Sequence, residues 1–213
     1  MNDYFNDFFT EHADLSKCRD SIEQAFLCIK GCYLNKGKLL ICGNGGSASD
    51  AEHIVGELMK GFLLERGIPR NDRDAITEKF PDEAEYLIKN LQRALPALSL
   101  VSQTAFLTAY MNDKAPDMIF AQQVYGYAEK VDALIVISTS GNAANVCNAA
   151  RVARSIGVRT IGMTGEKKCL LDGLCDIVIK VPSDITYKIQ ELHVSVYHVL
   201  CSALENEFFG NEG

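Results

Sequence analysis

Two groupings of histidine with carboxylate or amide side chains are the residues in this sequence best suited to chemistry. His53 and Glu57 are four residues apart, so on a helix both project from one face. Far along the chain, the stretch from Gln190 to His198 again combines imidazole groups with a carboxylate and an amide. Such groups bind divalent metal ions or transfer protons, although a single histidine is also common as a hydrogen-bonded packing residue. The residues by themselves leave both interpretations open.

Helical spacing ranks the companions of His198 only in part. Glu191 is seven residues before His198 and shares its face, whereas Gln190, eight residues before, is rotated by about 80°. His193 points well away from His198 at the same helical spacing. Periodicity therefore favours Glu191 together with Gln190 and does not choose between them.

Two turns rich in glycine or hydroxyl groups are candidates for binding a phosphate group. GNGGS at 43–47 and STSGN at 138–142 each follow a short apolar run and lead directly into a helix. The first N–H groups of a helix are unpaired and attract anions, and the hydroxyls of the second turn add further donors. A purely structural tight turn is the alternative. Neither turn has the GxGxxG spacing of a dinucleotide site or the Gly-Lys-Ser/Thr ending of a Walker A loop.

These groups require a scaffold in which strands alternate with helices. Short apolar runs predict strands at 38–42, 97–101, 133–137, 159–163 and 176–181. The intervening stretches predict helices at 103–110, 120–127, 143–156 and 185–209. Such connections give a mostly parallel α/β sheet covered on both faces, with ligands bound beyond the carboxyl ends of its strands.

Residues 1–213 are expected to form one α/β domain, with two smaller domains as the alternative. The N-terminal segment 1–35 has an amphipathic pattern that predicts one or two helices. Segment 63–95 is charged, contains two prolines and has one helical candidate at 82–93. We interpret it as an excursion from the sheet, either a lid or interface arm or a solvated decoration without a catalytic role.

Composition argues against several broad classes of function. A net charge of −7 without a dense basic run argues against a nucleic-acid partner and against binding to an anionic membrane surface. No apolar run approaches the ~20 residues that a membrane-spanning helix needs. The 8 cysteines include no CxxC pair, and no secretory signal opens the sequence. We therefore expect reduced thiols and a cytoplasmic location.

The sequence resembles the sugar isomerase (SIS) domain family and, within it, the phosphoheptose isomerases. The resemblance rests on pieces that run in family order: CGNGGSASDAEH at 42–53, Glu57, the pair Asn112-Asp113, ISTSGNAANV at 137–146, and IQELH followed by His198. It implies a three-layer flavodoxin-like fold, with a five-stranded parallel sheet and helices on both faces. It also implies a homotetramer with active sites between subunits.

The resemblance also implies roles for particular residues. It implies one zinc ion (Zn2+) per subunit, and it selects Gln190 where helical spacing does not, because the implied ligands are His53, Glu57, Gln190 and His198. Ser47 is a further candidate for binding the phosphate. The remaining residues implied to contact the substrate are Asn44, Gly45, Gly46, Glu57, Asn112, Asp113, Ser138, Thr139, Ser140 and Gln190.

The implied reaction is an aldose–ketose isomerisation of sedoheptulose 7-phosphate to D-glycero-D-manno-heptose 7-phosphate through an enediolate. Such chemistry needs a base and an acid beside the carbonyl group, and Glu57 is the expected base with His198 as its acid–base partner. The alternatives are isomerisation of another sugar phosphate, or a non-catalytic SIS module. That module would be a phosphosugar sensor or a tetramer that binds the replication initiator.

The sequence departs from the family pattern in three places. Ala143 stands where a further serine usually follows STSGN, and Lys60-Gly61-Phe62 stands where an arginine usually precedes an aromatic residue. The segment after Leu63 is longer than in typical members. These departures concern the groups that would bind the phosphate and the identity of the sugar.

Overall fold

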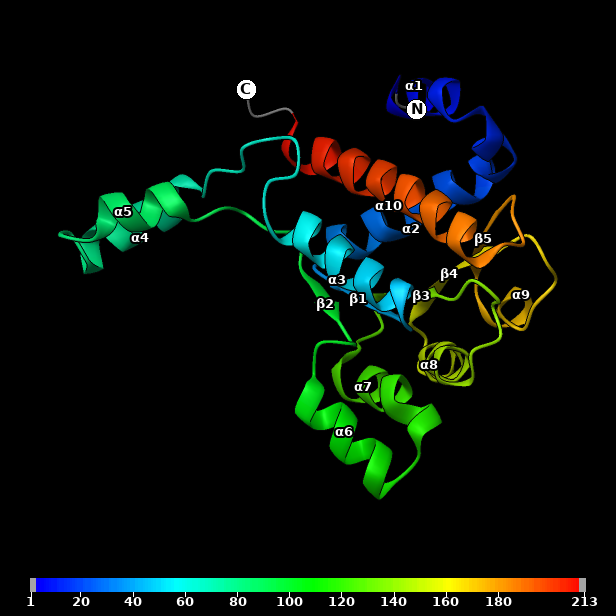
Figure 1. Cartoon of the computed structure of the whole chain (residues 1–213). Coiled ribbons are helices and arrows are strands. Elements are labelled where there is room, and N and C mark those ends of the chain that lie inside the picture. The colour runs from blue at the N-terminus through cyan, green and yellow to red at the C-terminus, as the bar shows by residue number, and fades with distance from the viewer. Residues whose placement is uncertain (1–2, 211–213) are drawn as a thin grey trace.

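Five parallel strands form the sheet at the centre of the molecule (Figure 1). The structure is a computed structural model that describes residues 3–210. The expected domain also includes residues 1–2 and 211–213, which lie outside the described residues. The strand order is β2-β1-β3-β4-β5, and each pairing is parallel. The predicted five-stranded parallel sheet is confirmed by β1 (Leu39–Gly43), β2 (Ala97–Ser99), β3 (Ala133–Ile137), β4 (Arg159–Gly165) and β5 (Ile177–Val181).

Helices precede, connect and follow these strands. The N-terminal segment contains two helices and a short 3-10 helix, α1 (Asp3–Glu11), η1 (Ala13–Cys18) and α2 (Arg19–Leu34). The later helices are α3 (Gly46–Met59), α4 (Arg70–Lys79), α5 (Ala84–Asn90), α6 (Thr104–Asp113), η2 (Pro116–Met118), α7 (Ile119–Tyr127), α8 (Ala144–Ser155), α9 (Leu171–Leu174) and α10 (Thr186–Phe209). Of the described helices, none combines the length and apolar content needed to cross a membrane.

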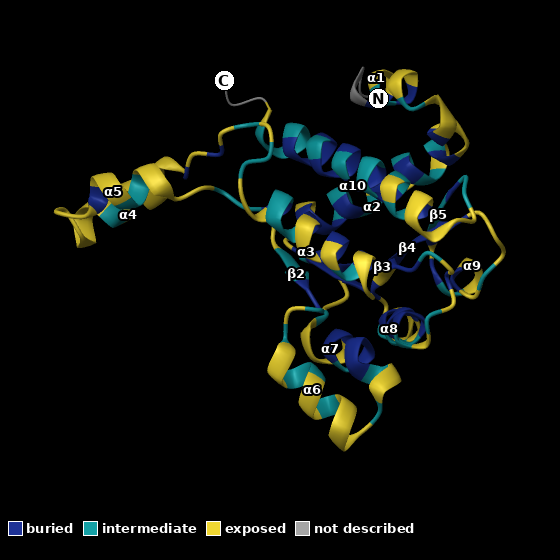
Figure 2. Cartoon of the chain, in the orientation of Figure 1, coloured by how far each residue is buried: buried dark blue, intermediate teal, exposed yellow. Residues whose placement is uncertain are grey.

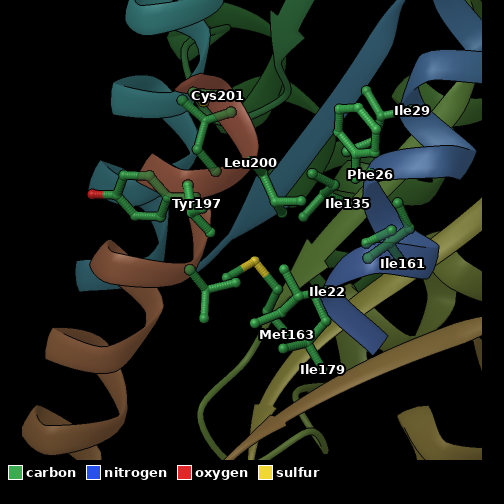
Figure 3. Packing of buried hydrophobic residues seen from close by; sticks show 14 of the residues in the cluster. Ile22, Phe26, Ile29, Ile135, Ile161, Met163, Ile179, Tyr197, Leu200 and Cys201 are labelled. Atoms are coloured by element: carbon green, nitrogen blue, oxygen red, sulfur yellow. The ribbon is translucent and has the colours of Figure 1, made fainter. Parts of the chain in front are cut away.

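Strand side chains alternate between the two faces of the sheet, because successive residues of a strand point in opposite directions. In β1, Leu39 and Ile41 face the core that α2, α3 and α10 complete. Leu40 and Cys42 face the opposite core, which α7 and α8 complete. Figure 3 shows the first of these cores, where side chains of α2 and α10 pack over the central strands. Both faces are thus covered, as fully apolar strands require.

Between α3 and β2 the chain forms an arm, residues 63–95, whose helices α4 and α5 project from the body of the molecule (Figure 1). Figure 2 shows that most of these two helices is exposed, and Ala84 is the residue that they bury. Phe80 and Tyr86 are 55% and 72% exposed. The sequence predicts one helix here, and the structure has two. The helix that was not predicted, α4, buries no side chain, so its sequence lacks the apolar periodicity that indicates a helix.

A buried ion pair fixes the root of the arm. Arg66 Nε donates to Glu205 Oε1 of α10 at 2.8 Å, and both residues are 0% exposed. The guanidinium also donates to the carbonyl oxygen of Leu58, the last buried residue of α3, at 2.7 Å. The carboxylate accepts hydrogen bonds of 2.6–3.1 Å from three consecutive backbone N–H groups, those of Phe62, Leu63 and Leu64. The chain that leaves α3 is therefore tied to α10.

We predict that Glu205→Ala lowers the free energy of unfolding by about 3–5 kcal/mol, because the Arg66 charge then stays buried without its partner. Urea unfolding followed by circular dichroism measures this change. The matched control is Asp74→Ala, which breaks the exposed Arg70–Asp74 pair in the arm and should cost less than about 0.5 kcal/mol. Equal stabilities of the two variants would contradict the assigned role of the buried pair.

Candidate active site

The two candidate phosphate turns lie side by side at the carboxyl edge of the sheet. β1 and β3 are paired neighbours with Gly43 opposite Ile137, so the turns that follow these strands emerge together. The side-chain amides of Asn44, in the first turn, and Asn145, at the start of α8, exchange two hydrogen bonds of 2.9 Å. These bonds tie the first turn to the start of the helix that follows the second turn.

The first turn presents its backbone rather than a capping side chain. Gly45, with φ of 58°, precedes the first residue of α3, and no side chain caps this helix. The N–H of Ser47 bonds to the carbonyl oxygen of Asn44, and Ser47 is 3% exposed. Gly45 and Gly46 are exposed. The backbone of the two glycines is therefore the part of the turn that is open to a phosphate oxygen, whereas Ser47 lies beneath it.

A hollow of about 250 Å³ opens beside the second turn. Thr139 and Ser140 line one side, and Lys167 and Lys168, from the loop after β4, line another. Ser138 is buried, with its hydroxyl 3.5 Å from that of Ser140. Hydroxyl and ammonium groups donate to phosphate oxygens, so the hollow suits a phosphate. Lys167 pairs with Asp184, which lines the same hollow, at 3.0 Å. Lys168 adds a positive charge that the sequence motifs do not reveal, because it follows a different strand.

His53 and Glu57 project together from α3, as their spacing predicts. His53 Nε2 is 3.1 Å from Glu57 Oε1, and the two side chains are 45% and 13% exposed. Lys60 Nζ is 3.3 Å from the second carboxylate oxygen of Glu57. The lysine that stands in place of the usual arginine therefore pairs with the predicted base.

His198 of α10 packs directly against this pair. Its ring centroid is 5.1 Å from that of His53 and 5.6 Å from that of Phe62. Burial lowers the pKa of His198, and nearby His53 acts in the same direction, whereas Glu57 opposes them. Its Nε2 atom is buried and has no hydrogen-bond partner in the described part of the chain. A neutral imidazole with an unpaired nitrogen is suited to accept a proton or to bind a metal ion.

The structure brings Gln190, rather than Glu191, to the site. Gln190 lies over the first turn of α3, where a Cβ atom on Gly46 would overlap its side-chain amide. Glu191 is exposed. Helix α10 packs along α3. Gln190, near the start of α10, therefore meets the glycine turn, and His198, about two turns later in α10, meets His53. Gln190 thus lies at the first candidate phosphate turn, on the same helix as His198.

The four predicted zinc ligands have the chemistry that zinc requires. They offer two imidazoles, a carboxylate and an amide oxygen, and the unpaired Nε2 of His198 is a donor atom without a partner among residues 3–210. Within that same range no three His, Cys, Asp or Glu side chains stand in a metal-binding arrangement. Here His53 Nε2 and Glu57 Oε1 are hydrogen-bonded to each other. The donor types of these four residues suit a divalent ion, and its binding by them stays a prediction.

Asn112 and Asp113 lie at the exposed end of α6, where Asn112 Nδ2 donates to Asp113 Oδ1 at 2.9 Å. Among the described residues, no hydrogen bond or ion pair joins them to His53, Glu57 or His198. Their contact with the substrate stays a prediction.

Sequence reasoning missed two groups that contact the predicted residues. Asn145 pairs with Asn44, and the hydroxyl of Tyr197 lies 2.9 Å from Nδ1 of His53. Asn145 had a signal, since it is a polar residue in the first turn of a helix that follows STSGN. Tyr197 had a weaker one, namely a hydroxyl beside His198 in an otherwise apolar stretch.

Sequence comparison assigns the family of this chain. The profile of the SIS domain matches residues 3–71 and 74–165. The phosphoheptose isomerase of Aliarcobacter butzleri is 41% identical over 189 residues, which cover 89% of this chain and 86% of that protein. The chain belongs to the phosphoheptose isomerase family of SIS-domain proteins. A phosphoheptose isomerase from Nitratiruptor sp. is 39% identical and covers 86% of this chain and 84% of its own length.

Solved structures of the family have the same fold. The phosphoheptose isomerase of Francisella tularensis superposes with a TM-score of 0.75 at 29% identity, over 95% of each chain. The enzyme from Neisseria gonorrhoeae gives a TM-score of 0.73, also at 29% identity and over 95% of each chain. The family and fold that the motifs indicate are both confirmed.

His193 is a buried histidine of α10 that takes no part in the site. It is 0% exposed, and neither ring nitrogen makes a hydrogen bond of ordinary geometry with the described residues. Burial lowers the pKa of His193 from 6.5 to about 4, and the backbone at Thr164 opposes this shift. The folded protein therefore keeps this ring neutral at pH values where the unfolded chain protonates it.

We predict that His193 destabilises the fold as the pH falls from 6.5 to 4. The pKa of His193 is lower in the folded state than in the unfolded state. The contribution of His193 to the free energy of unfolding is therefore fully present above pH 6.5, and it is lost as the pH falls from 6.5 to 4. At about 1.4 kcal/mol per pH unit, the loss reaches roughly 3 kcal/mol. Urea unfolding at a series of pH values should show a flatter pH dependence of stability for His193→Leu than for the wild type. An unchanged dependence in His193→Leu would refute the assignment.

Proposed function

We propose that this chain isomerises sedoheptulose 7-phosphate to D-glycero-D-manno-heptose 7-phosphate. The proposal is carried by one observation: Glu57, His53 and His198 converge where α3 meets α10, beside two neighbouring turns suited to phosphate. Relatives of 39–41% identity that bear the name phosphoheptose isomerase support it.

The reaction moves one hydrogen between neighbouring carbons and one between neighbouring oxygens. Glu57 removes a proton from C1 of the ketose, which gives an enediolate with its negative charge on the C2 oxygen. His198 takes the proton of the C1 hydroxyl and gives it to the C2 oxygen. Glu57 then returns its proton to C2, and C1 becomes the aldehyde. The lowered pKa of His198 suits this role, because the ring begins and ends the cycle neutral.

The remaining groups of the site bind and orient the substrate. The backbone of Gly45 and Gly46, the hydroxyls of the second turn and the two lysines beside it hold the phosphate. Gln190 reaches from α10 to the glycine turn and orients the oxygens of the sugar. We include a zinc ion that the side chains of His53, Glu57, Gln190 and His198 would hold and that would polarise the substrate oxygens. The lone pair of His198 Nε2 would serve the ion or the transferred proton, and not both at once.

We also propose a homotetramer with sites between subunits and a cytoplasmic location. Leu34, Tyr125 and Tyr187 are 63%, 69% and 59% exposed, and apolar side chains of this size support a further covering surface. All eight cysteines are free thiols, which supports a reducing compartment.

We predict that Glu57→Gln lowers kcat for sedoheptulose 7-phosphate by about 10²–10⁴-fold, because the amide cannot accept the C1 proton. Steady-state assays of aldose formation measure this loss. The matched control is Glu52→Gln on the same helix, whose carboxylate is exposed and bonds to Ser102, and it should keep the wild-type rate. An active Glu57→Gln enzyme would remove Glu57 from the mechanism.

Elemental analysis of the purified protein is expected to find one zinc per chain. His198→Ala and Gln190→Ala should each lower the zinc content, whereas Glu191→Ala should preserve it, because Glu191 is exposed on the same helix. Treatment with a chelator should abolish isomerisation, and added zinc should restore it. A wild type without zinc, or full zinc content in both ligand variants, would rule out the four-residue site.

A further inference from the structure

Tyr197 links the apolar core of α10 to the histidine of α3. Its ring is 2% exposed, and Figure 3 shows its hydroxyl pointing away from the core side chains drawn there. The hydroxyl lies 2.9 Å from Nδ1 of His53 and 3.5 Å from Oδ1 of Asp50. The other ring nitrogen of His53, Nε2, faces Glu57. Tyr197 therefore contacts the nitrogen of His53 that points away from the predicted base.

Asp50 is a buried carboxyl within reach of the same hydroxyl. It is 8% exposed, and its Oδ2 atom has no hydrogen-bond partner among the described residues. Burial raises the pKa of Asp50, and the hydrogen bond from Tyr197 opposes that shift. The phenol of Tyr197 is both a donor and an acceptor of hydrogen bonds. Tyr197 is a donor and Asp50 is an acceptor that no other residue satisfies.

The Tyr197 hydroxyl has two orientations, and each sets a different tautomer of His53. When it donates to Nδ1, the His53 proton is on Nε2 and is shared with Glu57. When it donates to Asp50, its oxygen accepts the proton of Nδ1, and Nε2 carries a free lone pair. Only the second arrangement leaves Nε2 able to bind a metal ion.

We propose that Tyr197 is a positioning residue that holds His53 in its metal-binding tautomer by turning its own proton toward Asp50. The inference rests on the zinc site of the proposed function. Partners on the far nitrogen of a metal-bound histidine fix its tautomer and ring orientation, and losing them typically weakens metal binding by about 10–100-fold. Here that partner is a tyrosine from one helix, backed by an aspartate from the other.

The test compares Tyr197→Phe with Tyr33→Phe. Both variants remove a hydroxyl from a buried tyrosine, but the Tyr33 hydroxyl has no hydrogen-bond partner in the described part of the chain. Zinc affinity is measured by competition with a chromophoric chelator in the absence of substrate. We expect about 10–100-fold weaker zinc binding in Tyr197→Phe and wild-type binding in Tyr33→Phe.

A spectroscopic readout separates positioning from a general loss of structure. In the zinc-loaded wild type, the Nδ1 proton of His53 should exchange slowly with water in ¹⁵N-resolved NMR, because Tyr197 holds it. The His53 side chain is 45% exposed, so in Tyr197→Phe that proton should exchange fast. Tyr33→Phe should behave as the wild type does.

A second variant, Asp50→Leu, tests the same hydrogen-bond chain without removing the tyrosine. It removes the acceptor of the Tyr197 hydroxyl, so the phenol proton turns toward Nδ1 of His53 and zinc binding should weaken as in Tyr197→Phe. If Tyr197→Phe does not fold, Asp50→Leu decides by the same two measurements.

Equal zinc affinity and equal proton exchange in the wild type and the variants would overturn the proposal, and so would a wild type that binds no zinc. Neither measurement needs turnover. An inactive wild type with Tyr197-dependent zinc affinity would therefore overturn the proposed reaction and leave this inference standing.

Discussion

The parallel pairing of β1 with β3 is the constraint on which the arrangement of the site depends. Parallel neighbours end at the same edge of a sheet, so the turns after Gly43 and Ile137 meet there. The helices that follow pack on opposite faces, since α3 joins one core and α8 the other. The face that holds α3 also holds α10. The candidate phosphate-binding groups and the candidate proton-transfer groups then stand roughly 10 Å apart, because Gly46 and His53 are separated by seven residues of one helix.

Most of the scaffold could be predicted from the sequence, because the pattern of each element reports its own environment. Strands such as 133–137 are buried on both faces and therefore read as unbroken apolar runs. The pairing of His53 with Glu57 was equally accessible, since helical geometry fixes the distance between residues four apart. The choice between Gln190 and Glu191 was not, because it depends on how α10 lies along α3 rather than on periodicity within α10. The family resemblance selects Gln190, whose amide lies over Gly46 in the structure, and its role as a ligand stays a prediction.

What the sequence did not reveal depends on contacts between residues far apart in the chain. Arg66 and Glu205 are each an ordinary charged residue until the fold buries them together. The hydroxyl of Tyr197 contacts polar groups only because α3 brings His53 and Asp50 to it. The lysines after β4 become candidate site residues only because their loop lies beside the turn after β3. Helix α4 was missed for a different reason, since it packs against α5 without burying any of its own side chains and therefore has no apolar pattern.

The base of the arm, where the chain leaves and re-enters the body, separates the outer arm from the rest of the molecule. The sequences of these two parts can therefore vary at different rates. Where the chain leaves and re-enters the body, it is cross-linked by hydrogen bonds from Gly61 to Gln92 and from Leu95 to Leu58, in addition to the buried ion pair at Arg66. Beyond these links a doubling of loop length costs only about 0.6 kcal/mol of closure entropy. Insertions, deletions or a fused peptide in the outer arm would therefore leave the proton-transfer groups in place. The positions of His53, Glu57 and His198 therefore set no limit on the length of the outer arm, whether it serves as a lid, as an interface arm or as a solvated decoration.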